Sequence, residues 1–568
     1  MLLSRTLLRA QRHKFEIIRK SFTYSEKNTN WTRVYRLIKV GSFATVGFAV
    51  CVVLANEEEA PKKKLVILGS GWGAMSLLKS LKPGLYDISV VSPTNYFVFT
   101  PLLTAVTVGN VQSNSIIEPV RKILTKRYKN TGKFYEAECT SIDIENKKVT
   151  CHDKSVTSSE FCLDYDYVVV AIGAETATFN IQGVKENTHF LKSVHDAHAI
   201  RKHIMDSFES AAIPGQSDKE LQRLLHFVVV GAGPTGVEFS AQLHDFVKDD
   251  LQKYYPKHLI EKAQITLIDG LKRVLYTFSE DISSYTEELF KKQGINVVTS
   301  TFVTGIEKTQ ISLQDSQTKK HSVMPFGLCV WCGGITPREL TKKVINQIPG
   351  QNNKMGLLTD GHLKVKNTSN VFALGDCAVV QYTKISDYVE MLYDTEIKNG
   401  KNLSQFEELI EKGKMKYPHL SYHFKELKKL YNSKVLKLES EGSLSLKDLH
   451  SLAKIVDSKK NSLAPTAQVA YQEGVYLGKL LNEPEMLDNE ASFVSAEPFL
   501  YNHLGTFVYI GNNQAVLESP KIGDFKGYSA FWMWKGVYAS KCISLRMRCY
   551  VIFDWMKSYL FGRDISRS

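Results

Sequence analysis

Two glycine-rich stretches, each directly behind an apolar run, carry the clearest chemical signal in this 568-residue sequence. The first reads Lys64-Leu-Val-Ile-Leu-Gly-Ser-Gly-Trp-Gly-Ala74, and the second reads Leu225-His-Phe-Val-Val-Val-Gly-Ala-Gly-Pro-Thr-Gly236. Each is typical of a strand that turns tightly into a helix whose N-terminal amides can hold a phosphate. One match is weak evidence, but two complete matches in one chain predict two dinucleotide-binding units.

The residues of each loop have distinct tasks. Gly69 permits the tight turn, Gly71 lets a pyrophosphate approach the backbone, and Ala74 allows the helix to pack closely on the strand. The second loop repeats this pattern. The predicted cofactor-binding residues of the two loops are Gly69, Gly71, Trp72, Gly73, Ala74, Gly231, Gly233, Pro234, Thr235 and Gly236.

A dinucleotide fingerprint also requires an acidic residue at the end of its next strand. In the second unit Asp269 follows the apolar run Ile265–Ile268. Its carboxylate can accept hydrogen bonds from a ribose diol and would repel a 2′-phosphate, so it favours NADH over NADPH. Lys272 and Arg273 nearby act in the opposite direction. The first unit instead ends in Ser92, so its ribose contact must differ.

The elements that position these loops alternate between strands and helices from Lys64 onward. This alternation predicts parallel sheets covered by helices on both faces. With 43% hydrophobic residues the chain can bury two or more domains. The expected fold class is α/β, with two Rossmann-type dinucleotide-binding domains arranged as in glutathione-reductase-like flavoproteins, followed by a C-terminal helical region that anchors to a membrane.

Further motifs extend the signal beyond the two loops. They are Asn95–Leu103, Ile116–Arg121, Phe372–Cys377 and Ala464–Glu473. With these motifs the sequence resembles the type II (alternative) NADH:ubiquinone oxidoreductases. The match covers about residues 62–380 and resumes from 464 to the end. It is nearest to the fungal-type mitochondrial enzymes, and the apolar segment before the body resembles their external members.

This resemblance implies a set of site residues. FAD would be held non-covalently by family positions that match Gly69, Gly71, Ser92, Thr100, Gly173, Gly375 and Asp376. NADH would meet Gly231, Gly233, Gly236, Glu238 and Asp269. Gln468 and Gln472 match positions beside the flavin ring at the ubiquinone pocket.

In such an enzyme the flavin performs the hydride chemistry and the protein supplies placement. The catalytic residues are expected to be Glu238, Gln468 and Gln472, which would polarise ubiquinone or relay its two protons. For Glu238 a hydrogen bond to the nicotinamide is an equal alternative. Three departures from the family pattern concern Tyr471, which replaces a histidine, the turn Cys332-Gly-Gly334, and the insert 381–463, which separates Asp376 from Gln468. No spacing typical of a metal cluster and no set of spanning helices occurs in the sequence, so proton pumping is not expected.

The chain is expected to divide into eight parts. Their boundaries are a presequence at 1–34, a candidate transmembrane segment and linker at 35–61, FAD-binding parts at 62–190 and 335–380, an NADH-binding domain at 191–334, a helical insert at 381–463, an FAD/quinone-site segment at 464–502 and a membrane anchor at 503–568.

Positive charge is concentrated at the two ends. The formal net charge is +13, and residues 1–40 hold ten Lys/Arg against two acids, whereas residues 520–568 hold nine against three. A nearly neutral body argues against nucleic-acid binding. The first 34 residues read as a mitochondrial presequence, or alternatively as a disordered basic arm.

The 16-residue apolar run Val40–Ala55 is slightly short for a spanning helix. Basic residues precede it and Glu57–Glu59 follow it, so the body would face the intermembrane space from the inner membrane. In the competing interpretation the protein resides in the matrix and this run belongs to its presequence.

The last 40 residues alternate aromatic and basic side chains, which favours an amphipathic helix at the mitochondrial membrane surface. The alternatives are a helix packed on the body or a dimer contact, and we expect a homodimer. In the insert, Lys437–Asp448 resembles a calcium loop, but a lysine at its first ligand position argues against calcium binding.

Other functions within the same fold remain open at this stage. Cys329 and Cys332 lie in an apolar run and read as core residues. Cys377, beside Asp376, leaves a sulfide:quinone reductase as an alternative. From a different class, the chain could be an apoptosis-factor-like NADH-binding flavoprotein whose flavin turns over slowly.

Overall fold

The computed structural model describes residues 61–566 except 130, 154–157, 383, 387–410, 412–426, 431–445 and 459–462. All described elements belong to the unit Lys63–Ser568. The expected presequence and the apolar run Val40–Ala55 lie outside the described residues, as does most of the insert. Among the helices that are described, none has the length and apolar character needed to cross a membrane.

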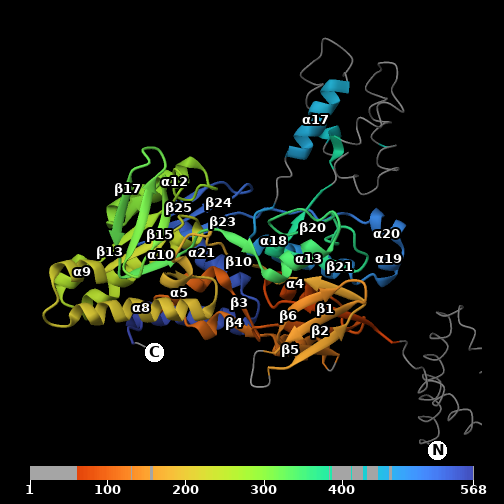
Figure 1. Ribbon diagram of the computed structural model, residues 1–568, viewed down its shortest axis with the longest axis horizontal. Coiled ribbons are helices and arrows are strands. Elements are labelled where there is room, and N and C mark those ends of the chain that lie inside the picture. The colour runs from red at the N-terminus through yellow and green to blue at the C-terminus, as the bar shows by residue number, and fades with distance from the viewer. Residues whose placement is uncertain are drawn as a thin grey trace, which may run out of the picture. The chain divides into compact units, whose positions relative to one another are not determined.

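The first sheet has the strand order β21-β9-β1-β2-β5, and every pairing in it is parallel (Figure 1). Its strands are β1 (Lys63–Leu68), β2 (Tyr86–Ser92), β5 (Gly132–Glu136), β9 (Tyr167–Val170) and β21 (Val371–Ala373). Residues 65–68 of β1 are buried on both faces, as expected of a central parallel strand. Helix α4 (Trp72–Ser80) starts directly after the first glycine loop.

The second sheet has the order β11-β18-β12-β13-β14 and is also wholly parallel. Its strands are β11 (His189–Phe190), β12 (His226–Val230), β13 (Gln264–Ile268), β14 (Asn296–Val298) and β18 (Leu328–Trp331). Helix α10 (Pro234–Asp245) starts at the second glycine loop. The two Rossmann-type sheets predicted from the sequence are therefore confirmed.

The chain passes between the sheets through a pair of short antiparallel strands, β10 (Ala174–Thr176) and β19 (Ile335–Pro337). Antiparallel three-stranded sheets accompany each half: β6 (Glu138–Asp143), β7 (Lys148–His152) and β8 (Glu160–Asp164) in the first, and β15 (Thr301–Ile306), β16 (Gln310–Asp315) and β17 (His321–Pro325) in the second.

Further elements complete the body. They are β3 (Tyr96–Val98), η1 (Thr100–Leu102), α5 (Leu103–Val106), η2 (Ser113–Ser115), β4 (Ile117–Pro119), α6 (Val120–Tyr128), α7 (Val184–Asn187), α8 (Val194–Ala212), α9 (Asp218–Leu224), η3 (Phe246–Asp250), η4 (Leu251–Lys253), α11 (Lys257–Lys262), α12 (Glu280–Gln293), α13 (Glu339–Gln347), β20 (Leu357–Thr359), η5 (Gly375–Cys377), β22 (Ala378–Val380), α17 (Leu446–Ser458), α19 (Pro484–Asp488) and α20 (Glu490–Ser495).

Helix α18 (Ala467–Leu480) packs along α4, as Figure 1 shows. Small residues let the two backbones approach closely. A Cβ added at Gly474 would lie 2.0 Å from Ser76 Oγ and 2.2 Å from the carbonyl oxygen of Gly73. A larger side chain at position 474 would therefore force the two helices apart.

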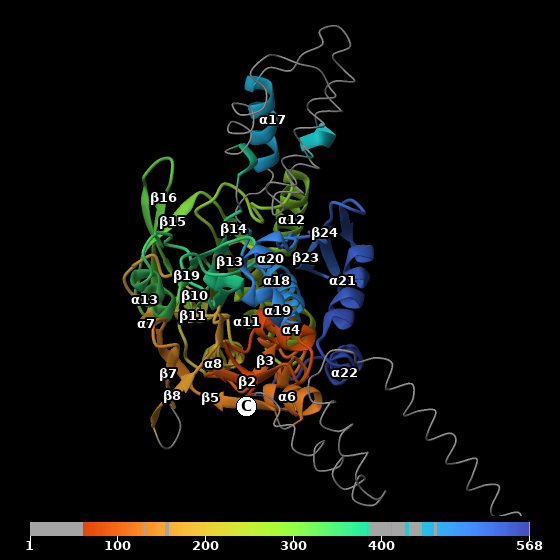
Figure 2. The same ribbon diagram turned by 90° about the vertical axis from the view of Figure 1, so that its right-hand side faces the viewer.

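The C-terminal part consists of the antiparallel strands β23 (Thr506–Gly511), β24 (Gln514–Glu518) and β25 (Phe525–Gly527) and the helices α21 (Tyr528–Lys541) and α22 (Leu545–Phe561). Figure 2 shows α21 and α22 along one side of the body. Strand β23 packs against α10 of the second Rossmann domain.

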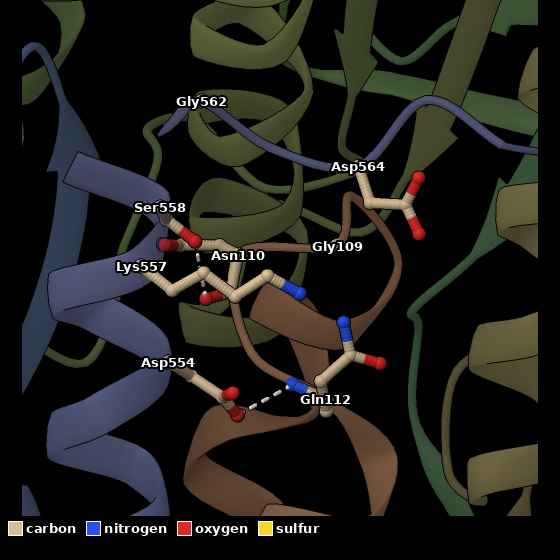
Figure 3. A pocket seen from close by; sticks show the side chains of 8 residues that line it. All are labelled: Gly109, Asn110, Gln112, Asp554, Lys557, Ser558, Gly562 and Asp564. Carbon is tan, nitrogen blue, oxygen red and sulfur yellow. Dashed lines mark hydrogen bonds between the residues drawn. The ribbon is translucent and has the colours of Figure 1, made fainter. Parts of the chain in front are cut away.

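Polar contacts seat α22 on the loop 109–112. Asp554 accepts a hydrogen bond from the Gln112 N–H at 2.9 Å, and Ser558 Oγ donates to the Asn110 carbonyl at 3.1 Å (Figure 3). The residues that line this small pocket do not belong to either glycine loop. It is a helix-docking contact, distant in sequence from both fingerprints.

The two ends of the insert are joined at their base. The Asp457 carboxylate on α17 accepts the backbone N–H groups of Ile385 at 2.9 Å and Ser386 at 3.0 Å. Most of the sequence that resembles a calcium loop, from Lys437 to Ser445, lies outside the described residues.

Candidate FAD, NADH and quinone sites

The first glycine loop has the geometry that a pyrophosphate site needs. Gly69 adopts a φ of +113° and donates its N–H to the Val91 carbonyl at 2.7 Å. A Cβ at this position would lie 2.3 Å from the Ala171 carbonyl oxygen. Gly71, which precedes α4, has open space where its side chain would be. The backbone N–H groups at the start of α4 are thus accessible to a phosphate.

Two further predicted FAD positions border the same region. Gly173 has no atom within 4 Å of its would-be Cβ, so it leaves room for a ligand. Gly375 donates its N–H to Glu473 Oε2 at 2.6 Å. Burial, with a smaller contribution from the charge of Asp376, raises the pKa of the Glu473 carboxyl to about 8, although the Gly375 hydrogen bond opposes this shift. Glu473 therefore fastens the Gly375–Asp376 turn to α18.

Glu473 was not among the predicted site residues. The only signal in the sequence was an acid that follows Gln472 in an otherwise weakly charged helix. Its role depends on a contact with Gly375, nearly one hundred positions earlier, that a single sequence does not reveal.

The hydroxyl groups near the first loop are already paired with one another. Ser92 ends β2, and its Oγ donates to Ser70 Oγ at 2.9 Å. Thr100 Oγ1 accepts the Trp72 indole N–H at 3.0 Å. These contacts hold Ser92, Thr100 and Trp72 beside the loop, and their binding to FAD stays a prediction.

The second loop is built in the same way. Gly231 has a φ of +103° and donates its N–H to the Ile268 carbonyl at 2.8 Å. A Cβ at Gly236 would lie 1.9 Å from the Gly231 carbonyl oxygen, so only glycine fits there. Gly233 is open, and Pro234 is the first residue of α10. The backbone of Cys332 and Gly333 closes against Gly231, which gives the unusual Cys-Gly-Gly turn a structural task.

Asp269 lies directly after β13, as predicted. Its Oδ2 accepts the Ala232 N–H at 2.5 Å, and its Oδ1 accepts the Leu271 N–H at 2.7 Å. The carboxylate thus holds the glycine loop in place, and its remaining lone pairs are left for a ribose. Arg273 donates to the carbonyls of Tyr276 and Phe278, whereas Lys272 is exposed.

Glu238 lies buried where α10 meets α5 and β23. Its carboxyl accepts the Tyr509 N–H at 3.1 Å and the Thr104 hydroxyl at 3.5 Å. Burial raises the pKa of Glu238 to about 8, and these hydrogen bonds lower it only in part. At neutral pH the side chain is therefore largely a neutral acid that can release a proton within the physiological range.

The same helix makes a second contact with the C-terminal part. The Tyr509 hydroxyl donates to Asp245 Oδ2 at 2.5 Å, and the Asn512 N–H donates to Asp245 Oδ1 at 3.1 Å. Glu238 and Asp245, near the two ends of α10, thus hold β23 and the turn that follows it. The NADH-binding helix and the C-terminal part are joined by these two carboxyl groups.

The two predicted quinone-site glutamines are engaged with one loop. Gln468 Oε1 accepts the Tyr501 hydroxyl at 2.6 Å and the Leu504 N–H at 3.0 Å. Gln472 exchanges two hydrogen bonds with the backbone of Asn502, at 2.8 and 3.0 Å. Within the described residues no hydrogen bond joins either glutamine to Glu238. The glutamines share one helix and one loop, whereas Glu238 belongs to a separate cluster.

Cys377 and Cys329 are buried in the core, and Cys332 is half-buried. Cys377 is buried and donates to the carbonyls of Val170 and Leu374, and burial raises its pKa to about 12. Burial likewise raises the pKa of Cys332 to about 12 and that of Cys329 well above its usual range. None of these three thiols is poised as a nucleophile.

Comparison with known families agrees with this arrangement. Residues 63–399 match the family described as pyridine nucleotide-disulphide oxidoreductase, and residues 503–564 match the NDH2 C-terminal domain. The sulfide:quinone oxidoreductase of Aquifex aeolicus superposes with a TM-score of 0.56 at 15% identity, a likeness of fold alone.

Full-length relatives are more specific. The external alternative NAD(P)H-ubiquinone oxidoreductase B1 of Solanum tuberosum mitochondria is 40% identical over 96% of this chain and 100% of its own length. The external alternative NADH-ubiquinone oxidoreductase of Yarrowia lipolytica is 34% identical, over 94% of this chain and 87% of that protein. The structure of NDH2 from Plasmodium falciparum in complex with NADH aligns with a TM-score of 0.78 and 30% identity, covering 89% and 100% of the two chains. The chain therefore belongs to the type II (alternative) NAD(P)H-ubiquinone oxidoreductases, flavoproteins of the pyridine nucleotide oxidoreductase fold.

Proposed function

We propose that this chain oxidises NADH through a non-covalent FAD and reduces ubiquinone at the surface of the mitochondrial inner membrane, without pumping protons. The observation that carries the proposal is the pair of phosphate-binding loops, each at the start of a helix, with a C-terminal helical module joined to the second helix.

The residues that fit FAD are those around the first loop. Gly69 and Gly71 leave the N-terminus of α4 open to the pyrophosphate, and Gly173 leaves room nearby. When bound, FAD supplies the chemistry that accepts a hydride and passes on two electrons. The task of the protein is to hold NADH and ubiquinone in order, to exclude water and to deliver protons.

The second loop and Asp269 bind and orient NADH. The loop presents the start of α10 to the pyrophosphate, and the Asp269 carboxylate is placed to accept a ribose hydroxyl. Glu238 is a buried acid on the same helix, four residues beyond its first turn residue Pro234. Its carboxyl is protonated at neutral pH. We assign to Glu238 the role of donating this proton when ubiquinone is reduced.

Gln468 and Gln472 define one edge of the proposed ubiquinone pocket. Both side chains fasten the segment Tyr501–Gly505 to the first turns of α18. Tyr471, the residue that replaces a family histidine, lies between them in sequence and is exposed. In this arrangement the glutamines shape the pocket wall. Because a glutamine amide does not ionise, any proton relay must involve another, titratable group.

Helix α22 supports attachment to the membrane surface. Its buried side chains, Met547, Val551, Asp554 and Trp555, form one face, which packs on the body. Away from that face the helix exposes Leu545 (74%), Tyr559 (88%), Ile552 and Phe553, and its last residue, Phe561, is also exposed (79%). Such an apolar face next to Arg546 and Lys557 fits the headgroup region of a bilayer. Thus α22 both packs on the body and presents an apolar surface.

Steady-state assays test the activity. The purified full-length protein should oxidise NADH rapidly only when a soluble short-chain ubiquinone is present, and acid-released FAD should equal the protein in moles. Slow NADH oxidation that ubiquinone does not accelerate would instead support the apoptosis-factor-like alternative.

The proposed orientation has a separate test in intact mitochondria. Added NADH should be oxidised without opening the inner membrane, and protease should reach the body once the outer membrane alone is opened. Protection until the inner membrane is broken would place the body in the matrix. Light scattering on the purified protein tests the expected homodimer, which a monomer mass in detergent and in vesicles would contradict.

A further inference from the structure

Lys192 lies near the start of the second Rossmann domain, between β11 and α8. It is the second residue after β11 and directly precedes Ser193, the N-cap of α8. Its N–H donates to Asp196 Oδ2 at 3.0 Å, within the capping box that Ser193 and Asp196 form. The backbone of Lys192 is therefore fixed, and so is the direction in which its side chain leaves the chain.

The ammonium group of Lys192 is buried, and within the described residues Nζ has no hydrogen-bond partner. A buried cation without an acceptor is costly, and proteins rarely keep one without a reason. Burial lowers the pKa of Lys192, whereas the Asp376 and Glu175 carboxylates favour its charged form. An acceptor that completes this environment is missing from the protein atoms alone.

Two of the charged groups around Lys192, Glu175 and Arg338, have other partners. The Glu175 carboxylate lies 4.0 Å from Lys342 Nζ, and Arg338 Nε donates to the Ile172 carbonyl at 2.9 Å. Asp376 attracts Lys192 but makes no hydrogen bond with it. Internal ion pairing therefore does not account for the side chain.

The groups that interact with Lys192 come from the two turns that border the candidate FAD site. Glu175 follows the turn that holds Gly173, and Asp376 belongs to the turn that Glu473 fastens. Gly173 leaves open space beside the first of these turns. The Lys192 ammonium has three N–H groups to donate, and it lies next to the site where the phosphate–ribityl chain of FAD is expected. Such a buried cationic donor fits an anionic, oxygen-rich part of a ligand.

We propose that Lys192 Nζ donates a charge-assisted hydrogen bond to the phosphate–ribityl chain of FAD. Lys192 lies between β11, a strand of the NADH-domain sheet, and helix α8, so a residue from the second domain contributes to binding the cofactor of the first. In this way bound FAD contacts residues of both domains. The inference adds a positioning residue to those that the glycine loops supply.

The test uses the full-length protein with Lys192→Met, and Lys192→Gln in parallel in case the methionine variant does not fold. Lys202→Met is the matched control, because Lys202 lies on α8 but is exposed and paired with Asp206. FAD affinity is measured by rebinding FAD to the deflavinated protein, and melting temperature is measured with and without FAD. Lys192→Met should weaken FAD binding by about 10-fold to 100-fold, the range for a lost charge-assisted hydrogen bond. Lys202→Met should bind FAD as the natural protein does.

The melting temperatures separate this role from a structural one. Removing an unpartnered buried cation should leave the deflavinated variant at least as stable as the natural protein, while the stabilisation gained on adding FAD should shrink. An unchanged FAD affinity in both Lys192 variants would overturn the proposal. So would a deflavinated variant that melts at a lower temperature but gains the normal stabilisation from FAD, because that result describes an ion pair between domains.

Discussion

The two glycine loops share one backbone pattern but differ in what covers them. At the first loop, Gly73 is buried under Leu374 and α18, and Glu473 on α18 fastens the Gly375 turn. At the second loop, the corresponding position is Thr235, which is exposed. A covered loop suits a cofactor that stays bound, and an open loop suits a substrate that must enter and leave at every turnover. The difference in cover separates the FAD site from the NADH site although their sequences read alike.

The largest expected effect lies at the open site. Asp269→Ala should raise the KM for NADH by about 10-fold to 100-fold, because one charge-assisted ribose bond of roughly 1.5–3 kcal/mol is lost. The preference for NADH over NADPH should narrow, and FAD content should stay at one per chain. Steady-state kinetics with both nucleotides measures the change.

Asp269 also holds the loop through Ala232 and Leu271, so the alanine variant alone is ambiguous. Asp269→Asn keeps an acceptor oxygen but removes the charge. If the asparagine variant keeps the loop conformation but loses the preference for NADH over NADPH, the negative charge of Asp269 acts on the ribose. A natural enzyme that already prefers NADPH would contradict this reading, with Lys272 dominating the site.

The covered site should respond to packing. Gly474→Ala places a methyl group 2.2 Å from the Gly73 carbonyl oxygen, so α18 must move away from α4. Overpacking of this kind costs about 1–3 kcal/mol. We expect a lower melting temperature and FAD lost during purification. Gly536→Ala on α21, where a Cβ meets nothing within 4 Å, is the control and should change neither. Full FAD occupancy in Gly474→Ala would mean that α18 does not confine the cofactor.

Ionisation of Glu473 at the covered site should make the stability of the protein depend on pH. The pKa of Glu473 is raised to about 8 from an ordinary value of 4.5, so the folded state binds a proton that the unfolded state releases above pH 4.5. Stability contributed by this group is therefore full below pH 4.5 and is lost progressively up to pH 8. Glu473→Gln keeps an acceptor for the Gly375 N–H but cannot ionise.

Melting curves between pH 5 and 9 measure this difference. The natural protein should lose stability over that range, and Glu473→Gln should lose less, with FAD retained at high pH. Glu238 has the same shift and should add to the slope, so Glu238→Gln is needed beside it. Parallel curves for all three proteins would show that neither carboxyl is neutral in the folded state.

Much of this organisation could be predicted from the sequence, because the glycine loops and Asp269 are encoded locally. A strand, a turn and a helix follow directly from the residue order. The roles of Glu473 and Lys192 could not, because each depends on a turn far away in the chain. The aromatic and basic pattern of α22 is compatible with a membrane surface or a packed helix, and only the three-dimensional contacts show that one face packs on the body while other large apolar side chains stay exposed. The position of Gln468 and Gln472 at the quinone pocket stays a prediction, and their hydrogen bonds to Tyr501–Gly505 are tertiary contacts that the sequence does not show.

The smallest expected effect concerns the quinone side, which belongs to neither glycine loop. Gln472→Leu removes two hydrogen bonds to the Asn502 backbone while it keeps the volume of the side chain. Each lost bond contributes about 1 kcal/mol, and solvent can replace part of it because the site is only half-buried.

If Gln472 shapes a wall of the quinone pocket, the KM for a soluble ubiquinone should rise about 5-fold, while the KM for NADH and the FAD content stay unchanged. Gln347→Leu makes the same substitution at an exposed position at the end of α13, outside the proposed pocket, and it should leave both KM values unchanged. A rise in the KM for NADH in Gln472→Leu would place the Tyr501–Gly505 segment at the nucleotide site. That result would remove the distinction between a quinone edge on α18 and an open NADH loop on α10.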